Sequence, residues 1–225
     1  MGPLIFFKST AYKIAFIPDV ADQSYTHKLE FIQIANVRNE AERRWNVIVA
    51  EEIGKNAHMT DADDSDEIID TVDITGASTD VVSTDFVEYE YAGQAHGQAQ
   101  SHMLVWSLRY NRALTLADLF THTDSGKALI ARRSMSHFDP SVGSDEGRTQ
   151  EAVRGTLDWI DANQIWYIAP YGLGLLYAPY AFGCYPCDGQ ALIPWAELAP
   201  ALKHQLPFAI KDLQNTWAEP TQGAP

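Results

Sequence analysis

The stretch that decides the fold runs from residue 86 to residue 120 and reads FVEYEYAGQAHGQAQSHMLVWSLRYNRALTLADLF. Residues 81–91 and 102–110 are rich in β-branched and aromatic side chains, which favour strands. Between them, Gly93 and Gly97 supply the backbone angles that a bulged turn needs. We therefore predict two paired strands joined by a turn, in which Gly93, His96 and Gly97 have a structural role.

Helices are expected on both sides of this hairpin. Apolar residues at helical spacing predict a helix over 36–53, started by Asn36 or Asn39 and ended by Gly54. Thr115 can cap a short helix, with Asp118 reaching back as in a capping box. Further helices are expected over 127–138, 149–160 and 195–206, and further strands over 12–17, within 164–180 and at 191–193. Because strands and helices do not alternate regularly, the sequence predicts an α+β fold with an antiparallel or mixed sheet and a few helices.

The charge of the chain is strongly one-sided. Its 225 residues include 16 Lys and Arg against 30 Asp and Glu, a formal net charge of −14. Such a chain is a poor partner for nucleic acids and anionic membranes, and it attracts cationic proteins, although the charge can also serve solubility alone. No run of eighteen apolar residues is present, as a membrane-spanning helix would need. The start has no secretory signal, so we expect a cytoplasmic protein or a mature fragment whose leader has been removed.

The region from Thr60 to Asp73 is dense in acidic residues. Asp61, Asp63 and Ser65 stand at alternate positions, as in a calcium-binding loop. The EF-hand pattern fails, because Asp66 stands where glycine is required and Val72 where the closing glutamate belongs. The sequence therefore predicts a solvated acidic loop without a metal ion.

The two cysteines form the motif Cys184-Tyr-Pro-Cys187. In redox enzymes this motif begins a helix directly after a strand, whereas here a turn pair, Asp188-Gly189, follows it. A local disulfide between Cys184 and Cys187 at a hairpin tip is the favoured interpretation. A redox site and half of a zinc site stay as alternatives.

No catalytic or metal-binding motif is visible in the chain. The patterns GxSxG and HExxH and the P-loop are all missing, and Gly172-Leu-Gly174 is interpreted as a turn. His96 and His102 would need a third ligand to hold zinc. We predict a protein that is not an enzyme and that uses no cofactor or metal. A hydrolase whose carboxylates meet only after folding stays as an alternative.

Residues 166–185 contain an unusual density of aromatic side chains. Such side chains fill cores, and they also anchor binding surfaces and stack on sugar rings. Filling of the core is the favoured interpretation, and binding of glycan or cell wall is the alternative. The residues are Trp166, Tyr167, Tyr171, Tyr177, Tyr180, Phe182 and Tyr185.

Three blocks in order, residues 89–97, 109–120 and 175–198, resemble a bacterial family. It is the PdaC/RsiV-like domain of unknown function, the extracytoplasmic domain of lysozyme-sensing anti-sigma factors and of peptidoglycan deacetylases. The blocks are similar to its aromatic strand with a GGAHG turn, its LTLxDLF helix, and its NPYxIAPYAAG stretch followed by IPYxEL. Gln94 replaces one glycine of the turn. Residues 12–53 are similar to the companion domain that usually precedes this family's domain.

The resemblance implies a companion-like segment over 1–75, a PdaC/RsiV-like domain over 76–217 and a frayed tail over 218–225, together in one compact unit. It also implies a periplasmic or secreted setting and the binding of a lysozyme-like protein. Our leading hypothesis is a non-enzymatic protein that recognises a cationic, cell-wall-active protein as an inhibitor, a sensor or a toxin-immunity protein. A peptidoglycan-binding module is the alternative. The expected contact residues are Asp61, Asp63, Asp64, Asp66, Tyr91 and Tyr180.

Overall fold

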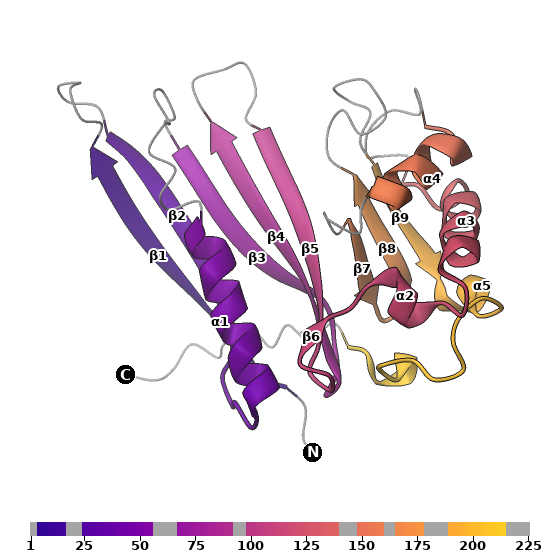
Figure 1. Ribbon diagram of the computed structural model, residues 1–225. Coiled ribbons are helices and arrows are strands. Elements are labelled where there is room, and N and C mark those ends of the chain that lie inside the picture. Colours follow the sequence, from indigo (N-terminus) through magenta and orange to yellow (C-terminus); the bar gives the residue numbers. More distant parts are fainter. Residues whose placement is uncertain are drawn as a thin grey trace.

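The computed structural model describes residues 4–16, 24–55, 67–91, 98–139, 148–159, 165–177 and 189–214. These residues form an α+β fold, as predicted (Figure 1). The strands are β1 (Phe6–Phe16), β2 (Ser24–Ile34), β3 (Glu67–Ala77), β4 (Val81–Tyr91), β5 (Gln98–Ser107), β6 (Arg112–Ala113), β7 (Trp166–Ala169), β8 (Gly172–Tyr177) and β9 (Gly189–Pro194). The helices are α1 (Glu40–Lys55), α2 (Leu116–Leu119), α3 (Thr123–Ser134), α4 (Gln150–Trp159), α5 (Trp195–Leu198) and the 3₁₀ helix η2 (Ile210–Asp212).

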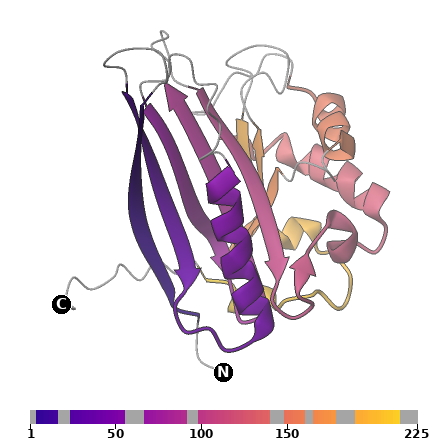
Figure 2. The ribbon, with the colours of Figure 1, turned by 60° about the vertical axis from the view of Figure 1, so that its left-hand side comes forward.

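The strands form two sheets that lie against each other. The larger sheet has the order β1-β2-β3-β4-β5-β6, and the smaller has the order β7-β8-β9. All neighbouring strands are antiparallel except β2 and β3, which are parallel. Helix α1 covers one face of the larger sheet, and β7 contacts β3, β4 and β5 from the other face (Figure 2). Helices α2 to α5 lie on the far side of the smaller sheet (Figure 1).

Side chains of β4 alternate between these two layers. Thr84 faces α1, because its hydroxyl accepts a hydrogen bond of 3.3 Å from the indole nitrogen of the fully buried Trp45. Ser83 faces the smaller sheet, because its hydroxyl accepts a hydrogen bond of 3.1 Å from the backbone nitrogen of Ile168. Successive residues of a strand point to opposite faces, so Asp85 shares the face of Ser83.

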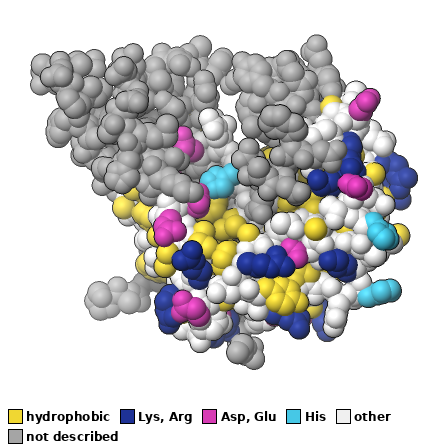
Figure 3. Space-filling model, viewed as in Figure 1, with side chains coloured by type: hydrophobic (Ala, Val, Ile, Leu, Met, Phe, Trp, Pro, Cys, Tyr) yellow, Lys and Arg dark blue, Asp and Glu magenta, His cyan; other side chains and the backbone are white. Residues whose placement is uncertain are grey.

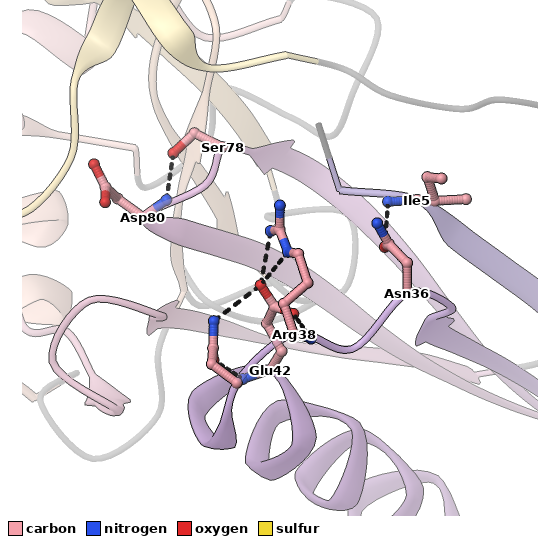
Figure 4. A network of polar contacts seen from close by, with 7 residues as sticks. Ile5, Asn36, Arg38, Glu42, Ser78 and Asp80 are labelled. Atoms are coloured by element: carbon pink, nitrogen blue, oxygen red, sulfur yellow. Dashed lines mark hydrogen bonds and ion pairs between the residues drawn. The ribbon is translucent and has the colours of Figure 1, made fainter. Parts of the chain in front are cut away.

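Helix α1 begins at a polar cap formed by Arg38, Asn39 and Glu42, which Figure 4 shows together with the neighbouring Asn36. The amide oxygen of Asn39 accepts a hydrogen bond of 3.0 Å from the backbone nitrogen of Glu42, so Asn39 is the N-cap. The buried carboxylate of Glu42 accepts hydrogen bonds from the backbone nitrogen of Arg38, at 2.6 Å, and from its guanidinium, at 2.7 Å. Asn36 instead accepts a hydrogen bond of 3.2 Å from the backbone nitrogen of Ile5.

Several local predictions were wrong. Residues 67–73 were expected within an acidic loop, yet they begin β3, where Val72 is fully buried. Strand β2 was not predicted, and α1 continues through Gly54 to Lys55. The helix expected over 195–206 ends at Leu198, because Pro200 restricts the residue before it.

The expected domain boundary after residue 75 falls inside β3, within a continuous sheet. The division into a companion-like segment and a second domain rests on sequence resemblance and stays a prediction.

Candidate functional site

A cavity lies between the two sheets and is the candidate functional site. It has a volume of about 310 Å³. One wall comes from β3, β4 and β5, and the other from β7, β8 and β9. The described residues that line it are Ile74, Thr75, Asp85, Met103, Tyr167, Ala169, Leu176, Gln190 and Leu192. The site therefore combines mostly apolar walls with four polar side chains, which is the composition of a small-molecule pocket.

A glycine on β8 determines how Tyr167 enters this cavity. Tyr167 and Gly174 are partners across β7 and β8. A Cβ atom at Gly174 would lie only 1.9 Å from the ring of Tyr167, so the ring occupies the space that a side chain would take. The phenol oxygen then accepts a hydrogen bond of 2.9 Å from the side-chain amide of Gln190. Burial raises the pKa of the Tyr167 phenol above its ordinary value, so it stays a neutral, polar group.

The two sheets are joined beside the cavity by a short chain of hydroxyl groups. Thr75 donates a hydrogen bond of 2.8 Å to the hydroxyl of Ser83, which also accepts the bond from the backbone of Ile168. A β-bulge between Ile74 and Gly76 lies next to this contact. A Cβ atom at Gly76 would lie 2.6 Å from the carbonyl oxygen of Ile168. Glycine thus permits the close approach of β3 to β7.

Asp85 contributes a carboxyl group to the wall of the cavity. Its Oδ1 atom is buried and has no hydrogen-bond partner among the described residues. Burial, with a further contribution from the negative charge of Asp73, raises the pKa of the Asp85 carboxyl to about 7. Near neutral pH this carboxyl is therefore divided between its protonated and ionised forms.

The residues expected at a binding site lie almost entirely outside the described parts of the chain. This holds for Asp61, Asp63, Asp64, Asp66, Gly93, His96, Gly97, Tyr180, Cys184 and Cys187. Tyr91 ends β4, where it pairs with Glu67 of β3. The proposed contacts, the structural turn and the disulfide remain predictions.

The described aromatic residues of the dense run are mostly core residues. Trp166, Tyr167 and Tyr177 are buried, as the favoured interpretation required. Tyr171, in the turn between β7 and β8, is 76% exposed. Gly174 lies within β8 and not in a turn, which corrects the interpretation of Gly172-Leu-Gly174.

His102 has a structural environment in β5. Its ring stacks on Phe86 with the ring centroids 4.8 Å apart, and its Nε2 atom lies 3.4 Å from a carboxylate oxygen of Glu52. Within the described ranges, no three His, Cys, Asp or Glu side chains are grouped to hold a metal ion. The described helices include none that is long and apolar enough to cross a membrane.

Sequence reasoning missed Asp85 as a candidate. The available signal was a carboxylate in the middle of a strand that is otherwise apolar or hydroxylated, VVSTDFV over 81–87. That signal does not identify a cavity, because the opposite wall comes from Tyr167 to Leu192, far along the chain from Asp85.

No family model and no curated protein matches the chain. Two solved structures of DUF3298 family proteins share its fold. One, from Pseudomonas aeruginosa, has a TM-score of 0.58 at 13% identity over 90% of this chain and 96% of its own. The other, from Bacteroides fragilis, has a TM-score of 0.57 at 18% identity over 89% of this chain and 94% of its own. DUF3298 is the PdaC/RsiV-like family that the sequence motifs resemble, and the chain has the fold of these proteins along nearly its whole length.

Proposed function

We propose that this chain is a non-enzymatic, periplasmic or secreted binding protein that recognises a cationic, peptidoglycan-active protein of the lysozyme type. It would act as an inhibitor, a sensor or a toxin-immunity protein. The fold shared with DUF3298 proteins agrees with the family resemblance on which this proposal partly rests. The observation that carries the proposal is the distribution of charge along the chain.

Positive and negative residues are unevenly distributed along the chain. All 16 Lys and Arg belong to the described ranges. Eleven acidic residues and no Lys or Arg belong to the remaining segments. These acidic residues are Asp19, Asp22, Asp61, Asp63, Asp64, Asp66, Asp145, Glu146, Asp161, Asp188 and Glu219. Most of the net charge of −14 therefore comes from segments 17–23, 56–66, 140–147, 160–164, 178–188 and 215–225.

On the described part of the surface, the two signs of charge are mixed. Figure 3 shows Lys and Arg side chains interspersed with Asp and Glu side chains over the visible described face. Ion pairs on the described surface include Arg112 with Asp118 and Arg154 with Asp124. Such a surface gives a distant cation little net attraction, so we expect the acidic segments to dominate long-range steering.

Three of the connecting segments are attached at one edge of the larger sheet. Thr26 pairs with Glu67, and Glu67 pairs with Tyr91. The next pair, Glu90 with Gln98, lies at the same edge, as does the pair Phe16 with Ser24. These residues flank segments 17–23, 56–66 and 92–97, and their strand ends form the upper edge of this sheet in Figure 1. We expect a cationic partner to approach this edge, because six of the eleven acidic residues belong to those segments.

The test is a pull-down with a panel of cationic cell-wall hydrolases at low and moderate salt. We expect capture that weakens as the salt concentration rises, since exposed charges are screened over about 8–10 Å at physiological ionic strength. Sedimentation with purified peptidoglycan distinguishes the alternative, because a wall-binding module would bind robustly and resist salt. Failure to capture any hydrolase at both salt concentrations would contradict the proposal.

A further inference from the structure

We propose that the cavity between the two sheets binds a small primary alkylamine, with its ammonium group at the carboxylate of Asp85 and its alkyl chain against the apolar wall. None of the described lining residues belongs to the acidic segments, and the proposal requires no partner protein. The cavity's volume of about 310 Å³ lies at the small end of the range for ligand pockets, so it has room for a short alkylamine and favours a small ligand.

The charge around the cavity favours a cation. The Oδ1 atom of Asp85 is buried without a hydrogen-bond partner among the described residues, so it offers an acceptor that a donor can satisfy. Asp73, its partner across β3 and β4, adds a second negative charge. The described lining includes no Lys, Arg or His. A ligand ammonium would supply both the missing counter-charge and the missing donor.

The rest of the lining suits a short alkyl chain. Met103 of β5, Leu176 of β8 and Leu192 of β9 contribute apolar surface on both sides of the cavity. Met103 is nearly buried and packs in a small cluster with Tyr167 and Ala169. The other polar side chains of the described lining are uncharged, namely the hydroxyl groups of Thr75 and Tyr167 and the amide of Gln190. They can orient a ligand without competing with its charge.

The protonation state of Asp85 gives binding a pH dependence. The titratable groups near it are Asp73 on β3 and Tyr167 on β7. The ammonium group of Lys8 lies 3.8 Å from Asp73 and 2.6 Å from Glu30. A neutral Asp85 attracts an ammonium less than a carboxylate does, so affinity should rise as the pH increases through about 7. It should fall again when the amine itself loses its proton, near pH 10.

The test is a calorimetric or NMR titration of the full chain with n-pentylammonium at about pH 8, where Asp85 is mostly ionised. The probe n-pentanol has the same chain without the charge. We expect saturable binding of n-pentylammonium, at least about tenfold tighter than that of n-pentanol. Asp85→Asn, which keeps the shape of the side chain, should weaken the binding of n-pentylammonium by about tenfold or more.

Asp124→Asn is the matched control, because it removes the same charge from a side chain that is 95% exposed on α3 and does not line the cavity. We expect it to change the affinity for n-pentylammonium by less than about threefold. Circular dichroism verifies that both variants are folded. Equal affinities for n-pentylammonium and n-pentanol, an unchanged affinity in Asp85→Asn, or no saturable binding of the amine would each overturn the proposal. None of these outcomes depends on whether a cationic protein partner exists.

Discussion

Asp73 of β3 and Asp85 of β4 are direct cross-strand partners on the face of the larger sheet that meets β7. Like charges at such positions repel each other, and the burial of Asp85 adds a larger cost for its ionised form. The side chain of Asp73 is 52% exposed, so its charge is better solvated. The pair therefore places an unfavourable charge at the junction of the two sheets, which protonation of Asp85 relieves.

This relationship predicts that stability decreases as the pH rises through neutrality. The folded-state pKa of Asp85, about 7, lies above the ordinary value near 4. Between these values the folded chain holds a proton that the unfolded chain has lost, so the free energy of unfolding falls as the pH rises across this window. Asp85→Asn should remove that slope and stabilise the protein by about 1–3 kcal/mol at pH 8, with little change at pH 4. Urea denaturation at pH 4 and pH 8 measures the free energy of unfolding of both proteins. An Asp85→Asn variant that is less stable than the wild type at pH 8 would contradict the prediction.

The capping box of the short helix α2 predicts the opposite dependence of stability on pH, a loss of stability as the pH falls. The Arg112 guanidinium, with hydrogen bonds of 2.6 and 2.9 Å, and the backbone of Thr115 lower the pKa of Asp118 to about 2. The stability from this group is complete above the ordinary pKa near 4, and it is lost as the pH falls through about 2. Asp118→Asn should lower the free energy of unfolding by about 1 kcal/mol at neutral pH and should leave it almost unchanged at pH 2.

The matched control for Asp118 is Asp80→Asn. Asp80 lies in the turn between β3 and β4. Its backbone nitrogen donates a hydrogen bond to the hydroxyl of Ser78, and its carbonyl oxygen accepts hydrogen bonds from the backbone of Leu108 and Arg109. Its carboxyl is not part of a helix cap. We expect the free energy of unfolding of Asp80→Asn to stay within about 0.5 kcal/mol of the wild-type value at neutral pH. Equal losses in both variants would mean that the capping box of α2 contributes no specific stability.

Two glycines, one within a strand and one within a helix, should respond oppositely to replacement by alanine. Gly174→Ala places a methyl group into the ring of Tyr167 and should destabilise the protein by about 2–3 kcal/mol. Gly155 lies within α4, and a Cβ atom there meets nothing within 4 Å, so Gly155→Ala should stabilise by about 0.5–1 kcal/mol. Thermal melting of both variants checks the pair. A harmless Gly174→Ala would show that Tyr167 does not lie across β8 as described.

Sequence reasoning succeeded where structure is determined locally. The strand over 81–91 was predicted with the bounds that β4 has, because its residues favour strands. The capping box of Thr115 and Asp118 was confirmed, because it needs only four neighbouring residues. The helix α1 was found from its apolar spacing, although Asn39 and not Asn36 caps it.

The missed features depend on contacts between distant segments. Strand β3 carries acidic residues that resemble a loop, and it becomes a strand through its pairing with β2 and β4. The cavity lies between the two sheets, which a hydrogen bond from Ile168 to Ser83 joins across 85 residues of sequence. The side chain of Asp85 gave only a weak signal, because a carboxylate in a strand usually faces solvent.

The most direct test of the proposed function is a calorimetric titration of a cationic lysozyme-type hydrolase into two charge variants. One variant replaces Asp61, Asp63, Asp64 and Asp66 with Asn. The control replaces four exposed acidic residues of the described surface, Glu51, Asp124, Glu151 and Asp212, with their amides. We predict that the first variant weakens binding at least about tenfold and reduces its salt dependence, while the control changes affinity by less than about threefold. Equal affinities of both variants and the wild type, or no binding of the hydrolase to the wild type at low salt, would contradict the account.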